Sequence, residues 1–126
     1  MNKSFIATPE APAAIGTYSQ AVKVGQTTFL SGQIPLIPET GDLVTGDIEA
    51  EVRQCFKNLE AVCRAAGGTL NHLAKVNVFL TDLAHFPVVN QVMEELLEAP
   101  YPARAAIGVA ALPKGARVEV DGILAH

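Results

Sequence analysis

The segment from residue 47 to residue 66 constrains the fold most, because it predicts a long helix with a single apolar face. Its apolar residues recur at intervals of three and four: Ile48, Val52, Cys55, Phe56, Leu59, Val62, Cys63 and Ala66. Asp47 is the expected N-cap, and Gly67 is the expected residue just beyond the helix. Such a helix gains most of its stability from packing, so the rest of the chain must supply a second layer.

Alternation of apolar and polar residues predicts that this second layer is a β-sheet. Strands are expected at residues 3–8, in a hairpin over 21–35 that turns at Gly25-Gln26, and at 73–81, 104–112 and 117–125. A second helix is expected from Ala84 to Glu98, with Pro87 in its first turn, where the missing N–H costs little. The order β-β-β-α-β-α-β-β predicts a single α+β domain over residues 1–126, with one mixed sheet of about six strands and two helices on one face.

The apolar content predicts an oligomer. The chain is 49% hydrophobic, and its mean hydropathy of +0.27 is high for so short a sequence. No apolar run approaches the ~18 residues of a membrane span, so no membrane partner is expected. The surplus apolar surface is better placed in a subunit interface. Other subunits are expected to cover the sheet face that the two helices leave open.

The charge and the cysteine content of the chain argue against several classes of protein. The net charge is −4 and the nine Lys and Arg residues are scattered, whereas nucleic-acid binders normally carry a basic stripe. Cys55 and Cys63 fall about 12 Å apart along the predicted helix, too far for a disulfide. No histidine stands at ligand spacing from them, so no metal is expected. The first residues lack the apolar core of a signal peptide, and a cytoplasmic location is expected.

Two charged residues interrupt the last two predicted strands. Arg104 opens the segment 104–112, and Glu119 lies inside 117–125. These strands are expected to be adjacent, with Ala106 on the face of Arg104 leaving space beside the guanidinium. An arginine facing a cavity binds a carboxylate through both arms of its fork, and a nearby glutamate can orient water or take a proton. A structural ion pair between the two strands is the alternative.

Five segments, in order and over nearly the whole chain, resemble the RidA family, also called the YjgF or L-PSP family. They are "APAAIGTYSQAV", "FLSGQIP", "AEVRQCFKNLEAVCRAAGG", "KVNVFLTDLAHFPVVNQVMEE" and "PARAAIGVAALPKGARVEVDGILA". The resemblance implies a chorismate-mutase-like fold. It also implies a homotrimer with a central barrel-like core and with sites in the clefts between subunits.

The same resemblance implies an enamine/imine deaminase, a hydrolase acting on C=N bonds. In this family 2-aminoacrylate and 2-aminocrotonate tautomerise to 2-iminopropanoate and 2-iminobutanoate, which are hydrolysed to a 2-oxo acid and ammonia. No cofactor is expected, because an imine carbon is already electrophilic. The expected partners are therefore small 2-imino and 2-oxo acids and further copies of the chain.

The resemblance also assigns expected roles to single residues. Arg104 matches the arginine that clamps the substrate carboxylate, and Glu119 matches the acid that positions the attacking water. These two are the expected catalytic residues. The residues expected to bind substrate beside Arg104 are Tyr18, Ser31, Gly32, Asn90 and Ala106. Ala106 replaces a cysteine common in the family, whose contact is made chiefly by its backbone N–H.

Structural alternatives stay open for several of these residues. Each has an explanation that needs no ligand. Tyr18 could pin its glycine-containing loop, Ser31-Gly32 could form a β-bulge, and Asn90 could be an ordinary solvated helix residue.

Other functions also stay open. A 2-oxo acid sensor needs only Arg104, whereas Glu119 favours an enzyme, because a pure binder has no need for a carboxylate beside a carboxylate ligand. The family's older label, endoribonuclease or translation inhibitor, needs cationic groups to stabilise phosphorane charge, and the acidic chain argues against it. Nothing in the sequence decides on chaperone-like activity.

Overall fold

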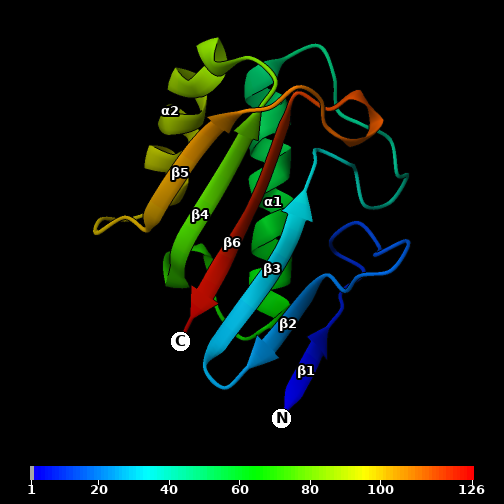
Figure 1. Cartoon of the computed structure of the whole chain (residues 1–126), viewed down its shortest axis with the longest axis vertical. Helices are drawn as coiled ribbons and strands as arrows, with labels where there is room; N and C mark the ends of the chain where they lie inside the picture. Colours follow the sequence, from blue (N-terminus) through cyan, green and yellow to red (C-terminus); the bar gives the residue numbers. More distant parts are fainter. Residues whose placement is uncertain (1) are drawn as a thin grey trace.

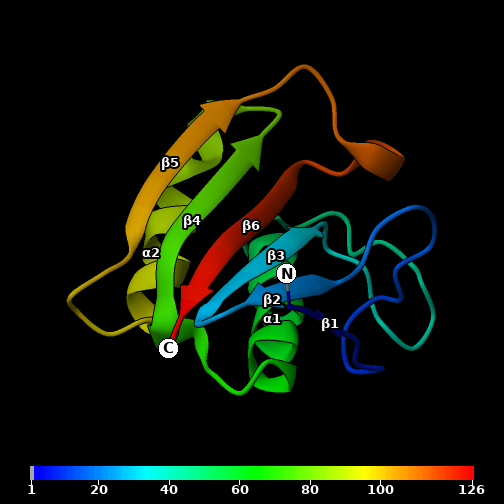
Figure 2. The ribbon, with the colours of Figure 1, turned by 60° about the horizontal axis from the view of Figure 1, so that its bottom comes forward.

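The computed structural model describes residues 2–126 and shows one six-stranded sheet with both α-helices on the same face (Figures 1 and 2). The elements are β1 (Lys3–Ile6), β2 (Ala21–Val24), β3 (Thr27–Gln33), α1 (Ile48–Ala65), β4 (Leu73–Leu80), α2 (Phe86–Leu96), β5 (Ala103–Gly108) and β6 (Val118–Ala125). Three short 3-10 turns stand at Leu70–His72, Leu83–His85 and Pro113–Gly115. The predicted α+β class and the order of elements are confirmed.

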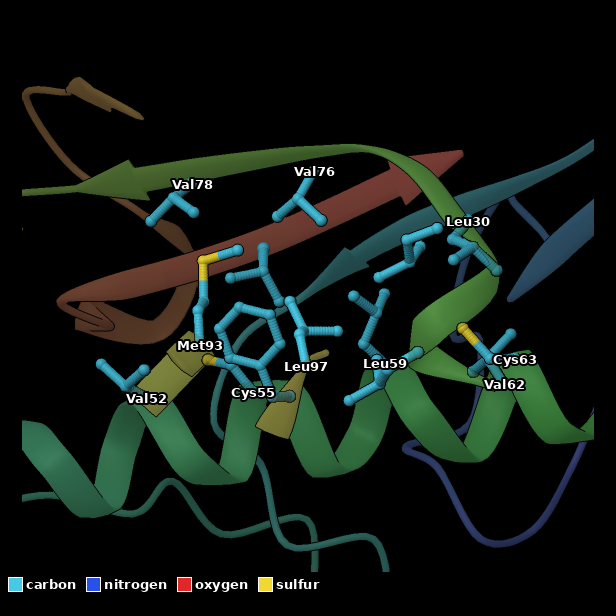
Figure 3. Close-up of a cluster of buried hydrophobic side chains, with 14 of the residues drawn as sticks. Leu30, Val52, Cys55, Leu59, Val62, Cys63, Val76, Val78, Met93 and Leu97 are labelled. Carbon is cyan, nitrogen blue, oxygen red and sulfur yellow. The ribbon is translucent and has the colours of Figure 1, made fainter. Parts of the chain in front are cut away.

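Helix α1 has the ends and the buried face that its sequence predicts. The Asp47 carboxylate accepts a hydrogen bond from the Glu49 N–H at 3.2 Å, and Gly67 follows the helix with a φ of +92°. Val52, Phe56 and Leu59 are fully buried against the sheet. Figure 3 shows this face of α1 directed at Val76 and Val78 of β4, so the main core lies between α1 and the sheet.

The second helix is shorter than predicted. It begins at Phe86, because Leu83–His85 forms a separate 3-10 turn capped by Asp82, whose carboxylate accepts from the Ala84 N–H at 2.9 Å. Pro87 lies in the first turn, as expected. Leu97 is buried beyond the last helical residue, so the apolar stripe outlasts the helix.

The strand order is β1-β2-β3-β6-β4-β5, which places β4 between β5 and β6 (Figure 1). The expectation that the last two strands are adjacent is therefore wrong. Strand β5 returns through α2 to lie parallel to β4, as a strand–helix–strand crossover requires, and the chain then crosses to the far side of β4 as β6. Strand β5 is the edge, and it stops at Gly108, opposite the last residue of β4.

Both cysteines are free and buried in the core. Burial raises the pKa of the Cys63 thiol to about 12 and also raises the pKa of Cys55. Both thiols therefore stay protonated near neutral pH, and neither supplies the reactive thiolate. Among the helices of residues 2–126, none has the length and apolar character needed to cross a bilayer.

The sheet face away from the helices exposes large apolar side chains. Phe5, Phe29 and Ile107 are each about half exposed or more. Phe5 and Phe29 belong to one row, because Val22 pairs with both of them. Ile107 lies beside Phe79, which in turn lies beside Glu119. An apolar face of this kind is typical of a protein–protein interface.

Candidate functional site

Arg104 stands on the edge strand β5 and turns its side chain toward α2. Its backbone pairs with buried Val76, and side chains of laterally paired residues share a face of the sheet. The Nη1 atom donates to Oδ1 of Asn90 at 3.0 Å and lies 3.7 Å from Sδ of Met93. The Cζ atom lies 4.8 Å from the centroid of the Phe86 ring. The guanidinium is thus held by α2 through a hydrogen bond and a cation–π contact.

Helix α2 supplies these contacts because Phe86, Asn90 and Glu94 are spaced four residues apart on one helical face. The Asn90 amide donates to Oε1 of Glu94 at 2.9 Å, which leaves its oxygen for Arg104. Asn90 is therefore more than a solvated helix residue.

Beside the guanidinium lies a cavity of about 240 Å³. Its lining residues are Asn90, Met93, Glu94, Tyr101, Pro102 and Arg104. Among residues 2–126, the hydrogen bonds of the Arg104 side chain all use Nη1. The other two nitrogens are left to bind a carboxylate.

Glu119 lies in β6 and points to the open face of the sheet. Its neighbour Val120 pairs with buried Val78, so Glu119 takes the opposite face. It lines a larger cavity, of about 620 Å³. The residues around this cavity are Pro12, Ala13, Ile15, Tyr18, Ser31, Gly32, Gln33, Ile34, Leu36, Pro113, Lys114 and Glu119. A carboxylate, a phenol and an ammonium group are thereby brought to one mostly apolar hollow.

The pairing of β3 with β6 shifts between Leu30 and Gln33, so Ser31-Gly32 forms the bulge that the sequence left open. The bulge brings the Gly32 backbone against the Glu119 carboxylate. A Cβ built on Gly32 would lie 2.1 Å from Oε2 of Glu119, which is closer than any real contact. Only glycine leaves room for the carboxylate in this position.

The environment of Glu119 favours its protonated form. Partial burial raises the pKa of the Glu119 carboxyl group above its usual value, and the negative charge of Asp121 raises it further. A carboxyl group with a raised pKa accepts and returns protons more effectively near neutral pH.

The loop before β2 forms one wall of the larger cavity and is tied down at both ends. The buried Gln20 side chain accepts from the Thr8 N–H at 2.6 Å and donates to the carbonyls of Thr8, Ala11 and Pro12. Near the other end, the Ser31 hydroxyl donates to the Ser19 carbonyl at 2.5 Å. Ser31 therefore anchors the loop as well as lining the cavity.

Tyr18, like Ser31, both contacts the loop before β2 and lines the larger cavity. A Cβ on Gly16 would lie 3.7 Å from its ring, so the ring lies over the glycine of its own loop. The side chain is still half exposed and lines the larger cavity.

Arg104 and Glu119 do not meet within one chain. They face opposite sides of the sheet, and β4 lies between their strands. Their partners on β4, Val76 and Phe79, are three residues apart, about 10 Å along the strand. The ion pair between Arg104 and Glu119 offered as the structural alternative is therefore wrong. One chain by itself does not bring the two side chains into one pocket.

The structure thus sorts the expected site residues into two groups. Arg104 and Asn90 line the smaller cavity, whereas Tyr18, Ser31, Gly32 and Glu119 line the larger one. Ala106 lines neither cavity and packs against the core beneath β5. Within residues 2–126 no three His, Cys, Asp or Glu side chains cluster as a metal site would require.

Sequence reasoning missed Phe86, Glu94 and Lys114. The four-residue spacing of Phe86 and Glu94 around Asn90 was a usable signal for the first two. Lys114 reaches its cavity only because the turn at 113–115 folds back toward β3, with Lys114 itself at a φ of +57°. No pattern in the sequence around Lys114 predicts that placement.

Comparison with known proteins places the chain in a family. The model of the family described as endoribonuclease L-PSP matches residues 8–126. A 2-iminobutanoate/2-iminopropanoate deaminase of the mite Dermatophagoides farinae is 48% identical over 122 residues, covering 97% of this chain and 95% of the relative. The crystal structure of RidA from the Antarctic bacterium Psychrobacter sp. PAMC 21119 is 54% identical, with a TM-score of 0.94 over 98% of this chain and 99% of that one.

A third likeness concerns a structure that contains a ligand. The crystal structure of Escherichia coli TdcF with bound serine superposes with a TM-score of 0.90 at 38% identity, covering 98% of each chain. The matches in sequence and in fold extend over nearly the full length of the chain, as do the five quoted segments. The chain belongs to the RidA family, whose family model bears the description endoribonuclease L-PSP.

Proposed function

We propose that this protein is an enamine/imine deaminase that hydrolyses 2-iminopropanoate and 2-iminobutanoate to a 2-oxo acid and ammonia. Relatives from mite, mouse and human, at 43% to 48% identity, are named 2-iminobutanoate/2-iminopropanoate deaminase. The observation that carries the proposal is the division of the reactive groups between two cavities. One holds a guanidinium with two nitrogens left to bind a carboxylate, and the other holds a half-buried carboxyl group.

Because these two groups face opposite sides of one sheet, the working site lies between two copies of the chain. Arg104 of one copy and Glu119 of the next are brought together when the open face of the sheet is covered. Exposed Phe29 and Ile107 give that face an apolar surface suited to association. A closed homotrimer, the assembly expected from the family, repeats the same contact three times.

The proposed chemistry needs few groups. Arg104 binds the carboxylate that all 2-imino acids share and so fixes the imine carbon. Glu119 takes a proton from water as the water attacks the carbon of the protonated imine, giving a neutral tetrahedral carbinolamine. The Glu119 proton then passes to the nitrogen and the C–N bond breaks to release ammonia. The hydroxyl group gives its proton to the Glu119 carboxylate as the carbonyl of the 2-oxo acid forms. Tyr18 and the backbone of Gly32, which line the Glu119 cavity, orient the water and the nitrogen. The backbone N–H of Ala106 donates a hydrogen bond to the substrate carboxylate.

The direct test couples the protein to a serine/threonine dehydratase and follows the decay of the imine. Wild-type protein is expected to accelerate decay, and Arg104→Ala is expected to lose about 30-fold or more in kcat/KM while keeping its oligomeric state. Arg104→Lys retains the charge without the fork and is expected to fall between them. An Arg104→Ala protein with full activity contradicts the carboxylate clamp.

The shared site has its own test. Trimers made only of Arg104→Ala subunits or only of Glu119→Ala subunits are each expected to keep about 3% of wild-type activity or less. Every mixed trimer contains one junction with both native residues. Random mixing in equal amounts is therefore expected to restore about a quarter of the wild-type activity. Recovery of no activity from verified mixed trimers means that Arg104 and Glu119 do not act across a junction.

One observation favours a second candidate, a sensor of small carboxylates. The relative TdcF was crystallised with serine bound. If wild-type protein leaves imine decay unchanged but binds 2-oxo acids in calorimetry, and Arg104→Ala does not bind them, the sensor is the correct function. We propose a cytoplasmic location for either activity, which the two free, buried cysteines support because such thiols suit a reducing compartment.

A further inference from the structure

Two side chains beside Glu119 form a polar pair that the proposed chemistry does not use. Asp121 lies two residues beyond Glu119 in β6, so both carboxyl groups project from the open face of the sheet. Asn77 of β4 pairs directly with Asp121, and its Nδ2 atom donates to Oδ1 of Asp121 at 2.8 Å. The hydrogen bond joins two partly buried residues on neighbouring strands.

We propose that Asp121, held by Asn77, is a positioning residue that acts on the reaction through Glu119. The hydrogen bond from Asn77 holds the Asp121 carboxylate two residues along β6 from Glu119, on the same face of the sheet. This arrangement deepens the proposed function and rests on it, because it assigns to Asp121 the control of when Glu119 takes and returns its proton.

The physical reason is repulsion between like charges on a face that solvent screens only in part. A negative Asp121 makes a second negative charge on Glu119 less favourable and so strengthens Glu119 as a base. The Asn77 amide donates to Asp121, which holds that carboxylate in place and keeps its charge from swinging away into solvent. The raised pKa of Glu119, with Asp121 as its second cause after burial, agrees with this geometry.

Other ionisable groups surround Glu119 and must be held constant in any test. They are Tyr18 and Lys114 at the cavity, Cys55 of α1 behind the strand, and the ion pair of Glu51 with Arg117 just before β6. In the assembled site Arg104 of the neighbouring copy is added to this set. Since none of these groups differs between wild type and an Asp121 variant, the comparison isolates the effect of Asp121.

The decisive variant is Asp121→Asn, which removes the charge but keeps an oxygen for the Asn77 amide. Imine hydrolysis by the assembled protein is measured from about pH 5 to pH 9. The acidic limb of kcat is expected to move to lower pH, because Glu119 stays ionised in more acid solution. The plateau is expected to fall about two- to tenfold, because a weaker base is a poorer catalyst. A merely structural role would lower the rate at every pH and leave the limb in place.

Glu98→Gln is the matched control, because it removes one negative charge from an exposed position outside both cavities. Its pH profile is expected to coincide with that of wild type. If Asp121→Asn keeps the wild-type profile while Glu98→Gln does too, the proposal is overturned.

A second measurement separates this inference from the deaminase assignment. Side-chain carboxyl carbons of glutamate are labelled with ¹³C, and the Glu119 resonance, identified with Glu119→Gln, is titrated by NMR in wild type and Asp121→Asn. A titration of Glu119 displaced to lower pH in the variant supports the inference even if no imine is hydrolysed. An unmoved titration overturns it even if the deaminase activity is present.

Discussion

The backbone of Gly32 lies so close to the carboxylate of Glu119 that a Cβ at position 32 would collide with it. A Cβ on residue 32 would lie 2.1 Å from Oε2, 2.9 Å from Cδ and 3.3 Å from Cγ of Glu119. The contact arises because the β3 bulge at Ser31-Gly32 presses the backbone toward β6. The glycine therefore fixes the place of the proposed base, and it does so without contributing a side chain.

Gly32→Ala is expected to displace the Glu119 carboxylate and to lower kcat about 10- to 100-fold, since small misplacements of catalytic groups have effects of that size. The fold is expected to survive, because the atom in the way is the end of a flexible side chain. Steady-state kinetics and thermal unfolding check the two parts.

Gly25→Ala provides the comparison. Its Cβ would meet nothing within 4 Å, and only its φ of +62° opposes the change. We expect a loss of about 1 kcal/mol in stability with unchanged activity. Equal activity losses in both variants would mean that the clash with Glu119 is not the cause.

Phe86→Leu is expected to raise KM about two- to fivefold with little change in kcat. The substitution removes the aromatic face 4.8 Å from Cζ of Arg104, a contact worth about 0.5–1 kcal/mol. Phe86→Tyr keeps the ring and is expected to retain the wild-type KM. An unchanged KM in Phe86→Leu shows that Asn90 alone is sufficient to orient the guanidinium.

Glu119→Gln is expected to stabilise the protein near neutral pH while removing its activity. The folded chain raises the pKa of Glu119, so the folded state binds this proton more tightly than the unfolded state. The resulting stability is fully present below the unfolded pKa and is lost as pH rises through the folded pKa. The Glu119→Gln variant has no carboxyl group to ionise at this position, so it does not lose this stability as the pH rises. Its Tm is expected to exceed that of wild type at about pH 7, and the difference is expected to shrink by about pH 4. A constant difference across this range contradicts the raised pKa.

Gln20→Leu is expected to lower the free energy of unfolding by about 2–4 kcal/mol, because it strands the backbone groups of Thr8, Ala11 and Pro12 that the buried amide now satisfies. Faster hydrogen exchange at residues 8–19 is expected as well. Gln26→Leu alters an exposed turn residue and is expected to change stability by about 0.5 kcal/mol or less. Slow exchange retained in Gln20→Leu would show that Ser31 alone holds the loop.

The sequence by itself determined the elements of this fold. The apolar stripe of 47–66, its Asp47 cap and the glycine at 67 specify α1, because these signals act within a few turns of the chain. Alternation located all six strands, and Arg104 and Glu119 stood out because a charged residue within a strand is conspicuous. The strand ends were less certain, since Gly108 ends β5 only where its partner β4 ends.

Only the tertiary structure decided which strands are neighbours and therefore where the charged residues point. Joining by a short turn favoured β5 next to β6, but the crossover through α2 places β5 beside β4 instead. That choice depends on how helices pack over the whole sheet, which no local pattern records. It sends Arg104 toward α2 and leaves Glu119 on the open face. The separation of these two residues, and with it the need for a second copy of the chain, is a consequence of long-range packing.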